Sequence, residues 1–238
     1  MRPPLVLLHG FTQTRQSWRR TIAALEGRRR ALAPDLPGHG QAASRPASFA
    51  ACTGYVRALG GERFALCGYS MGGRIALHAA LALGPRIERL VLVGASPGLA
   101  DPAEREARHA ADAALTERIE TIGIEAFAHE WGAQPLFSGQ PERVAAAAHA
   151  DRLRNSAPGL AAALRGLGTG TMEPLWDRLG ELTVPVTLVA GERDEKFRAI
   201  AERMAAAIPD ARVVVVPGAG HAAQLERPDA IAAAIQGV

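Results

Sequence analysis

The chain has 238 residues, 48% of them hydrophobic and 21% charged, a balance typical of one globular domain and not of a disordered or fibrous protein. The net charge of +3 comes from arginines scattered along the chain, so we expect an anionic small molecule as the partner and no nucleic acid. No apolar run approaches the roughly 20 residues of a membrane span, so we also expect no membrane partner.

Two cysteines are too few for a disulfide framework, and the start of the chain lacks the pattern of a signal peptide. We therefore expect a cytoplasmic protein, either a monomer or a small homo-oligomer. Both thiols, Cys52 and Cys67, fit small buried residues better than reactive ones.

Short apolar runs alternate with longer stretches of helical period. The predicted strands are 4–8, 30–34, 63–67, 89–94, 184–190 and 212–216, and the predicted helices are 17–26, 48–59, 71–83, 195–207 and 227–236. Most of the strands are continuous Val, Leu and Ala runs, as parallel strands covered on both faces require. The order predicts an α/β fold: an open, mostly parallel six-stranded sheet with helices on both faces.

One interval interrupts this alternation. Residues 98–183 contain no convincing strand, and their Ala- and Arg-rich helical segments are broken at Pro135, Pro141, Pro158 and Gly166–Gly170. Because strand–helix alternation resumes at Val184, we interpret 98–183 as a helical lid inserted into a core domain made of 1–97 and 184–238. A separate helical domain is the alternative.

A GxSxG motif follows the third predicted strand and opens a helix. It reads Gly68-Tyr69-Ser70-Met71-Gly72, in the strand–turn–helix context of a nucleophile elbow, so Ser70 is the candidate nucleophile. The helix start would place backbone N–H groups beside its hydroxyl. The motif alone is weak evidence, and its position between strand and helix is what strengthens it.

A base and a carboxylate follow the last two predicted strands. His221 comes after 212–216 and Asp194 after 184–190, at the sheet edge that also carries the elbow. The order Ser, Asp, His along the chain is the one found in α/β folds with a nucleophile elbow. His39, on another loop of the same edge, is the one competing base.

An oxyanion hole would use two backbone N–H groups, those of Met71 and of Phe11 in the loop after the first strand. His9 fits a strand-end hydrogen bond that holds this loop. The sequence has no HExxH, no cysteine cluster and no GxGxxG after a strand, so we expect no metal site and no cofactor.

Several further motifs run almost from end to end. They are LHGF at 8–11, DLPGHG at 35–40, GYSMGGR at 68–74, SPGL at 96–99, Trp131 with QPLF at 134–137, LRN at 153–155, GERDEKF at 191–197 and GAGH at 218–221. Together they resemble the 2-succinyl-6-hydroxy-2,4-cyclohexadiene-1-carboxylate synthases of menaquinone biosynthesis, members of the α/β-hydrolase superfamily. The chain departs from that fold's usual plan by starting at its third strand, and it has Gly132 after the lid tryptophan.

The resemblance implies a lyase and not a hydrolase. The substrate would be 2-succinyl-5-enolpyruvyl-6-hydroxy-3-cyclohexene-1-carboxylate. Ser70, activated by His221, would remove a ring proton, and pyruvate would be expelled. Asp194 would hold His221, and the N–H groups of Phe11 and Met71 would stabilise the oxyanion.

A tricarboxylate substrate needs cations. The resemblance implies substrate-binding roles for Arg108 and Arg154 on the lid, and Arg74 falls one turn after Ser70, where arginine suits a planar carboxylate. Lys196, the one lysine of the chain, stands two residues from Asp194 and is a further candidate. Trp131 and Tyr69 would line the pocket, whereas a last group is left as surface: Arg105, Arg118, Arg143, Arg152 and Arg165.

Two other functions stay open at this point. A carboxylic-ester hydrolase would use the same triad through an acyl-serine intermediate, because fold alone does not fix the reaction. A binding module that has lost catalysis is the second, against which the intact Ser, Asp and His argue.

Overall fold

The computed structural model describes residues 3–237. Its sheet has six strands in the order β2-β1-β3-β4-β5-β6, and every pairing between them is parallel. The strands are β1 (Leu5–Leu8), β2 (Ala31–Leu32), β3 (Phe64–Tyr69), β4 (Ile87–Val93), β5 (Val186–Gly191) and β6 (Ala211–Val216). All of their carboxyl ends therefore lie at one edge of the sheet, as the alternating sequence pattern predicted.

Successive side chains of the central strands enter two separate cores. In β1, Val6 and Leu8 pack into the first core, whereas Leu5 and Leu7 pack into the second. The same alternation holds along β3 and β4 because strand side chains point to opposite faces. Both faces are covered, which is why these strands read as continuous apolar runs.

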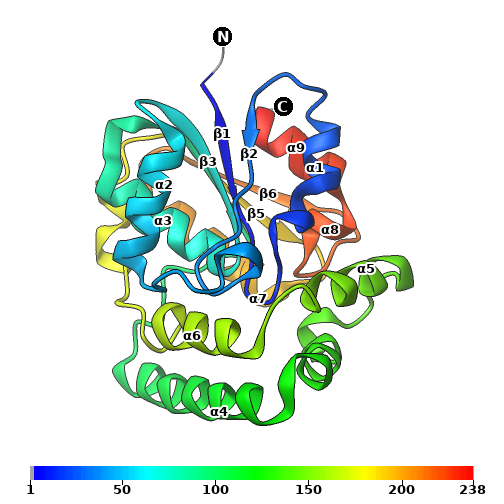
Figure 1. Ribbon diagram of the computed structural model, residues 1–238. Coiled ribbons are helices and arrows are strands. Elements are labelled where there is room, and N and C mark those ends of the chain that lie inside the picture. The colour runs from blue at the N-terminus through cyan, green and yellow to red at the C-terminus, as the bar shows by residue number, and fades with distance from the viewer. Residues whose placement is uncertain (1–2, 238) are drawn as a thin grey trace.

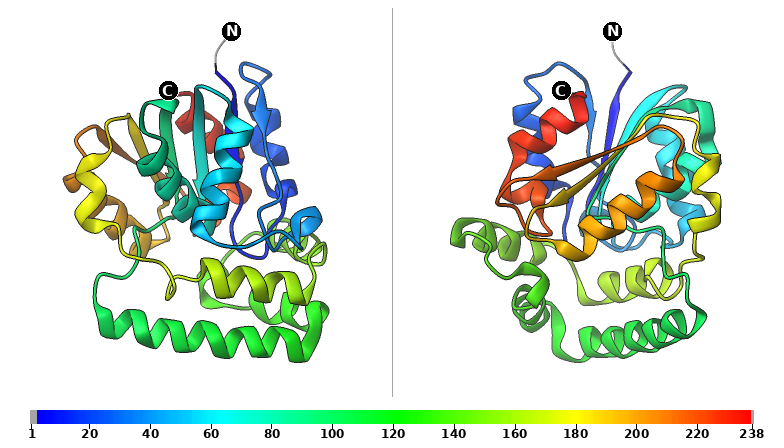
Figure 2. Two further views of the ribbon diagram at one scale, coloured as in Figure 1. Left: turned by 60° about the vertical axis from the view of Figure 1, so that its left-hand side comes forward. Right: turned by 180° about the vertical axis from the view of Figure 1, so that it is seen from behind.

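Helices form a layer on each face (Figure 2). The first core is closed by α2 (Phe49–Gly60), α3 (Met71–Leu83) and α7 (Glu195–Ala207). The second is closed by α1 (Arg19–Ala24), α8 (Ala223–Glu226) and α9 (Pro228–Gln236).

The segment between β4 and β5 forms a layer of helices across the end of the sheet (Figure 1). It contains α4 (Pro102–Gly132), α5 (Glu142–Arg152) and α6 (Ala157–Leu167). Gly123, at φ 77° and ψ 175°, kinks α4. A small apolar cluster joins α4 to α6 through Ile119 and Phe127 of α4 and Leu160 and Leu164 of α6. The first and last described residues lie at the opposite end of the molecule (Figure 1).

The sequence placed the elements well and their ends less well. The predicted strand 30–34 shortens to Ala31–Leu32, since Pro34 cannot donate to a ladder. The predicted helix 17–26 begins as a 3-10 turn at Arg15–Trp18, and α8 was missed because four residues show no period. Among residues 3–237 no helix combines the length and apolar character that crossing a membrane requires.

Candidate active site

Ser70 occupies a strained turn between β3 and α3. Its φ of 51° and ψ of −112° lie outside the ordinary regions for a residue with a side chain. The turn needs glycine on both sides: a Cβ at Gly68 would overlap the backbone of Gly72, and one at Gly72 would overlap the backbone of Leu8. Sequence and packing thus force the serine out at the carboxyl edge of the sheet.

His221 and Asp194 form a buried pair at the same edge. His221 Nδ1 lies 2.7 Å from Asp194 Oδ2, and the exposed fractions of the two residues are only 4% and 7%. Asp194 stands at the N-cap position of α7, but its side chain makes no capping hydrogen bond and is left for His221; its own N–H donates to Gly191 O. With Nδ1 bound to the carboxylate, Nε2 is the nitrogen left for a reacting group.

Ser70 and His221 line one cavity under the helical insertion. No hydrogen bond joins the two side chains in the described part of the chain, which is common for catalytic groups without substrate. The N–H of Met71 belongs to the first turn of α3, where no intrahelical acceptor exists. Phe11 and Met71 both line the cavity with Ser70, and the oxyanion hole formed by their N–H groups stays a prediction.

Two buried histidines hold the loop that carries Phe11. His39 Nε2 accepts the N–H of Thr12 (3.3 Å), and His9 Nε2 accepts the N–H of Leu36 (2.9 Å). Because Nε2 accepts in both rings, Nδ1 carries the proton and faces a carbonyl, Gly10 O or Pro37 O. His39 thus has a holding role, and it does not line the cavity as a competing base would.

Three cationic side chains line the cavity: Arg74, Arg108 and Lys196. Burial is the largest cause that lowers the pKa of Arg74 to about 10; the positive charge of Arg108 acts in the same direction, and Asp112 partly offsets the effect. Arg74 Nη2 donates to Leu167 O (2.9 Å), while its Nε is buried and has no partner. Two guanidinium groups, one of them with an unpaired buried donor, make this a candidate anion-binding end of the cavity.

Trp131 lines the cavity as expected, and its ring stands edge-on to Phe11 at 5.2 Å between centroids. Tyr69 does not line it. This side chain is 3% exposed and belongs to the second core, because residue 69 of the strand points away from the cavity. Its ring lies 5.4 Å from that of His221. Burial raises the pKa of Tyr69, and the charge of Asp194 adds to the effect.

Arg154 also lies elsewhere. Its side chain is 60% exposed and approaches Asp151 at 3.8 Å, over a shallow surface depression with Arg15 and Gln41. The neighbouring residues explain this, since Asp151 accepts the N–H of Thr14 and Asn155 donates to Thr12 O. These bonds fix the α5–α6 connection with residue 154 pointing outward.

Arg152, which the sequence left as surface, is buried instead. Its exposed fraction is 5%, its guanidinium lies 5.3 Å from the centre of the Phe137 ring, and its Nε has no partner. Burial lowers the pKa of Arg152. No carboxylate within residues 3–237 forms an ion pair with Arg152. The Phe137 ring that Arg152 contacts also lies near His221, as does the Tyr69 ring. Burying a guanidinium without a counter-ion costs free energy, so Arg152 would be stabilised by a bound anion.

Other cavity residues had no chemical signal in the sequence. They are Ser96, Gly98, Leu99, Gln134, Leu136, Ala163, Leu164, Leu167, Thr169, Phe197 and Ile200. Several of them fall within the motifs SPGL, QPLF and GERDEKF, so the motif pattern could have identified these. Phe197 packs on His221 at 4.5 Å between ring centres.

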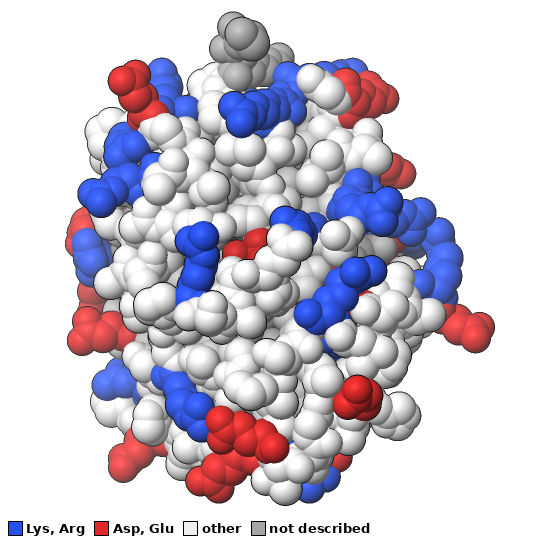
Figure 3. Space-filling model, in the orientation of Figure 1, with Lys and Arg blue, Asp and Glu red and all other residues white. Residues whose placement is uncertain are grey.

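Charged residues of both signs also lie outside this cavity. On the face shown in Figure 3, basic side chains are spread over the surface and acidic ones lie among them. Within residues 3–237 no three His, Cys, Asp or Glu side chains gather where they could hold a metal ion. Cys52 and Cys67 are both free and buried.

Comparisons with known proteins agree with this architecture. The model of the alpha/beta hydrolase family matches residues 5–234. The 2-succinyl-6-hydroxy-2,4-cyclohexadiene-1-carboxylate synthase of Serratia proteamaculans (strain 568) is 35% identical over 251 residues, covering 99% of this chain and 92% of the relative. The enzyme of the same name from Salmonella schwarzengrund (strain CVM19633) is 35% identical over 231 residues, covering 95% and 89%.

A solved structure agrees as well. The structure of MenH from S. aureus superimposes with a TM-score of 0.93 at 34% sequence identity, covering 99% of this chain and 92% of that one. The relatives are matched over nearly their whole length and not over a shared core alone. The chain therefore belongs to the alpha/beta hydrolase family and, within it, to the 2-succinyl-6-hydroxy-2,4-cyclohexadiene-1-carboxylate synthases.

Proposed function

We propose that this chain eliminates pyruvate from 2-succinyl-5-enolpyruvyl-6-hydroxy-3-cyclohexene-1-carboxylate, giving 2-succinyl-6-hydroxy-2,4-cyclohexadiene-1-carboxylate. One observation carries the proposal: Ser70 and His221 open into the same cavity as Arg74, Arg108 and Lys196. A serine base and a set of cations are what proton removal from a polyanionic substrate requires.

The reaction begins with the buried pair. His221 Nε2 takes the proton of the Ser70 hydroxyl, and Asp194, 2.7 Å from Nδ1, stabilises the imidazolium. The serine oxygen then removes the ring proton beside the succinyl ketone. The ketone oxygen gains the negative charge and is held by the N–H groups of Phe11 and Met71.

The second half returns the electrons to the ring. The enolate re-forms the ketone, a double bond forms at the deprotonated ring carbon, the existing ring double bond shifts by one position, and the carbon–oxygen bond to the enolpyruvyl group breaks. The serine keeps the ring proton as its hydroxyl, and the His221 imidazolium gives its proton to the departing enolpyruvate, which becomes pyruvate, so serine and histidine both return to their starting states. No bond forms between the serine and the substrate, so the cycle needs no water.

The cations supply binding and not chemistry. Arg74 and Arg108 would hold one substrate carboxylate at the α6 end of the cavity, and Lys196 would hold another beside α7. Arg152, buried under Phe137, would meet an anion that enters beside His221. An ester hydrolase that acts on neutral substrates would have no use for this set.

The test is pyruvate release from the enolpyruvyl precursor, followed with lactate dehydrogenase. We expect turnover by the parent protein and a loss of at least about a thousandfold in Ser70→Ala, with an unchanged melting temperature. Full activity of Ser70→Ala would contradict the role of the serine.

A chromogenic ester distinguishes the alternative reaction. An acyl-serine hydrolase gives fast ester turnover and a burst of bound acyl group. If the protein shows this behaviour and releases no pyruvate from the precursor, the chain is a hydrolase and the proposed elimination is wrong.

A further inference from the structure

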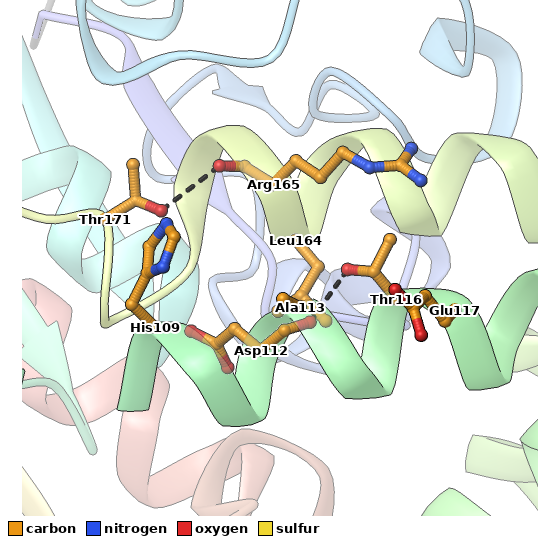
Figure 4. A pocket seen from close by; sticks show the side chains of 8 residues that line it. All are labelled: His109, Asp112, Ala113, Thr116, Glu117, Leu164, Arg165 and Thr171. Carbon is orange, nitrogen blue, oxygen red and sulfur yellow. Dashed lines mark hydrogen bonds between the residues drawn. The ribbon is translucent and has the colours of Figure 1, made fainter. Parts of the chain in front are cut away.

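A buried carboxylate lies behind the anion-binding end of the cavity. Asp112, in α4, is 4% exposed, and Figure 4 shows it on the side of the helix that faces α6 and the loop to Thr171. It accepts a hydrogen bond from Arg108 Nε at 2.7 Å and one from Gly170 N at 3.2 Å. The carboxylate thus joins the arginine to a backbone turn on a different element.

The bond to Arg108 uses the inner nitrogen of the guanidinium. Arg108 Nη1 and Nη2 form no hydrogen bond within the described residues, and the side chain lines the cavity. A guanidinium held at Nε can still offer both terminal nitrogens to a carboxylate. The ion pair therefore orients the arginine without occupying the nitrogens that a substrate would need.

The bond to Gly170 holds the turn that ends α6. Arg74 binds one side of this turn through Leu167 O, and Asp112 binds the other side through Gly170 N. Gly170 packs on the α4 backbone at His109, where a Cβ would overlap. Thr169, between the two anchors, lines the cavity.

The charges of Arg74, Arg108 and Asp112 also favour a fixed position for Arg108. The positive charge of Arg108 lowers the pKa of Arg74, and the negative charge of Asp112 partly offsets this effect. The three side chains together carry one net positive charge, which matches a single substrate carboxylate. Without Asp112, two facing guanidinium groups would repel each other, and Arg108, 44% exposed, could turn toward solvent.

We propose that Asp112 is a positioning residue for substrate binding: it aims the terminal nitrogens of Arg108 into the cavity and fixes the 168–170 turn beside them. This inference rests on the proposed function, because it assigns Arg108 to a substrate carboxylate. Asp112 acts through Arg108 and touches neither Ser70 nor the reacting atoms.

A double-mutant cycle on pyruvate release tests the assignment. The variants are Asp112→Ala, Arg108→Ala, their combination and Asp112→Asn, with Glu106→Ala as the control on an exposed position of the same helix. We expect Asp112→Ala to raise KM roughly tenfold, with kcat changed less than about threefold. In the Arg108→Ala background it should change KM less than about twofold.

The conservative variant adds a readout that a merely structural role would not give. Asp112→Asn keeps an oxygen that can accept the hydrogen bond of Arg108 Nε, so its KM should be close to that of the parent protein and well below that of Asp112→Ala. If Asp112→Ala does not fold by circular dichroism, Asp112→Ser takes its place in the cycle with the same expected result.

Two outcomes overturn the inference and leave the proposed function standing. One is an unchanged KM in Asp112→Ala while Arg108→Ala raises it. The other is an Asp112→Ala effect that persists undiminished in the Arg108→Ala background. An unchanged KM in Arg108→Ala itself would instead remove the substrate role of Arg108, and the inference with it.

Discussion

At the scale of single residues, the clearest contrast is between Arg152 and Arg154. Arg152 is the last residue of α5, whereas Arg154 lies in the turn beyond it, where one guanidinium points inward and the other outward. Arg152 is 5% exposed and pairs with no carboxylate within the described chain, whereas the Arg154 side chain is 60% exposed and lies beside Asp151. The two arginines form a matched pair for measuring how much a buried guanidinium contributes to substrate binding compared with an exposed one.

We expect Arg152→Gln to raise KM for the enolpyruvyl substrate by about tenfold to a hundredfold, because a charge-assisted contact of about 1.5–3 kcal/mol is lost. Arg154→Gln should change KM less than about threefold, since an exposed and screened charge contributes little. Steady-state kinetics of the two variants decides the matter. The reverse order of effects would restore the role that sequence motifs gave to Arg154.

The same contrast shows what sequence could and could not provide. Ser70, Asp194 and His221 each lie within five residues of the end of a strand, so a parallel sheet brings them to one edge whatever the details of packing. The direction in which a side chain points within an irregular segment follows no such rule. Tyr69 and Arg152 were both assigned to the wrong side because one residue of strand, or two of helix end, reverses the direction of a side chain.

At the scale of elements, the loops that carry Asp194 and His221 are tied together beneath the site. Arg193 N donates to Ala219 O (2.9 Å), and Arg193 Nη2 lies 2.7 Å from Glu226 Oε2, which also accepts Gly220 N (3.0 Å). Arg193 Nη1 reaches Gly139 O in the helical insertion (2.9 Å). One arginine thus connects the two catalytic loops with the insertion.

Removal of this arginine should leave a buried carboxylate behind. The Glu226 side chain is 1% exposed, so we expect Arg193→Met to lower the free energy of unfolding by about 1–3 kcal/mol, near the low end because Arg193 is partly exposed. The double variant with Glu226→Gln should be less destabilised than Arg193→Met alone, as the orphaned charge is gone. Urea unfolding measures both, and a double variant that is the less stable of the two would contradict this account.

At the scale of the whole molecule, neutral histidines are built into the fold. Burial lowers the pKa of His9 to about 4, that of His39 to about 3 and that of His78 to about 4. In the unfolded chain these histidines bind protons near pH 6.5, whereas in the folded chain they stay neutral at that pH. Stability contributed by these groups is therefore complete above pH 6.5 and is lost as the pH falls toward 4.

Each such histidine should contribute a slope of about 1 kcal/mol per pH unit to the free energy of unfolding between pH 6 and pH 5. We expect His39→Gln, whose amide oxygen can still accept the N–H of Thr12, to reduce the slope by that amount. Urea titrations at pH 7, 6 and 5 provide the comparison, and equal slopes for parent and His39→Gln would refute the assignment.

The ends of the described chain lie away from the helical insertion (Figure 1), and this has a practical consequence. A tag, a fluorescent partner or a tether attached at either end would lie at the end of the molecule opposite the helical insertion that covers the site. The protein could be immobilised on a solid support, or fused in line with an enzyme that supplies its substrate, with the attachment far from that insertion.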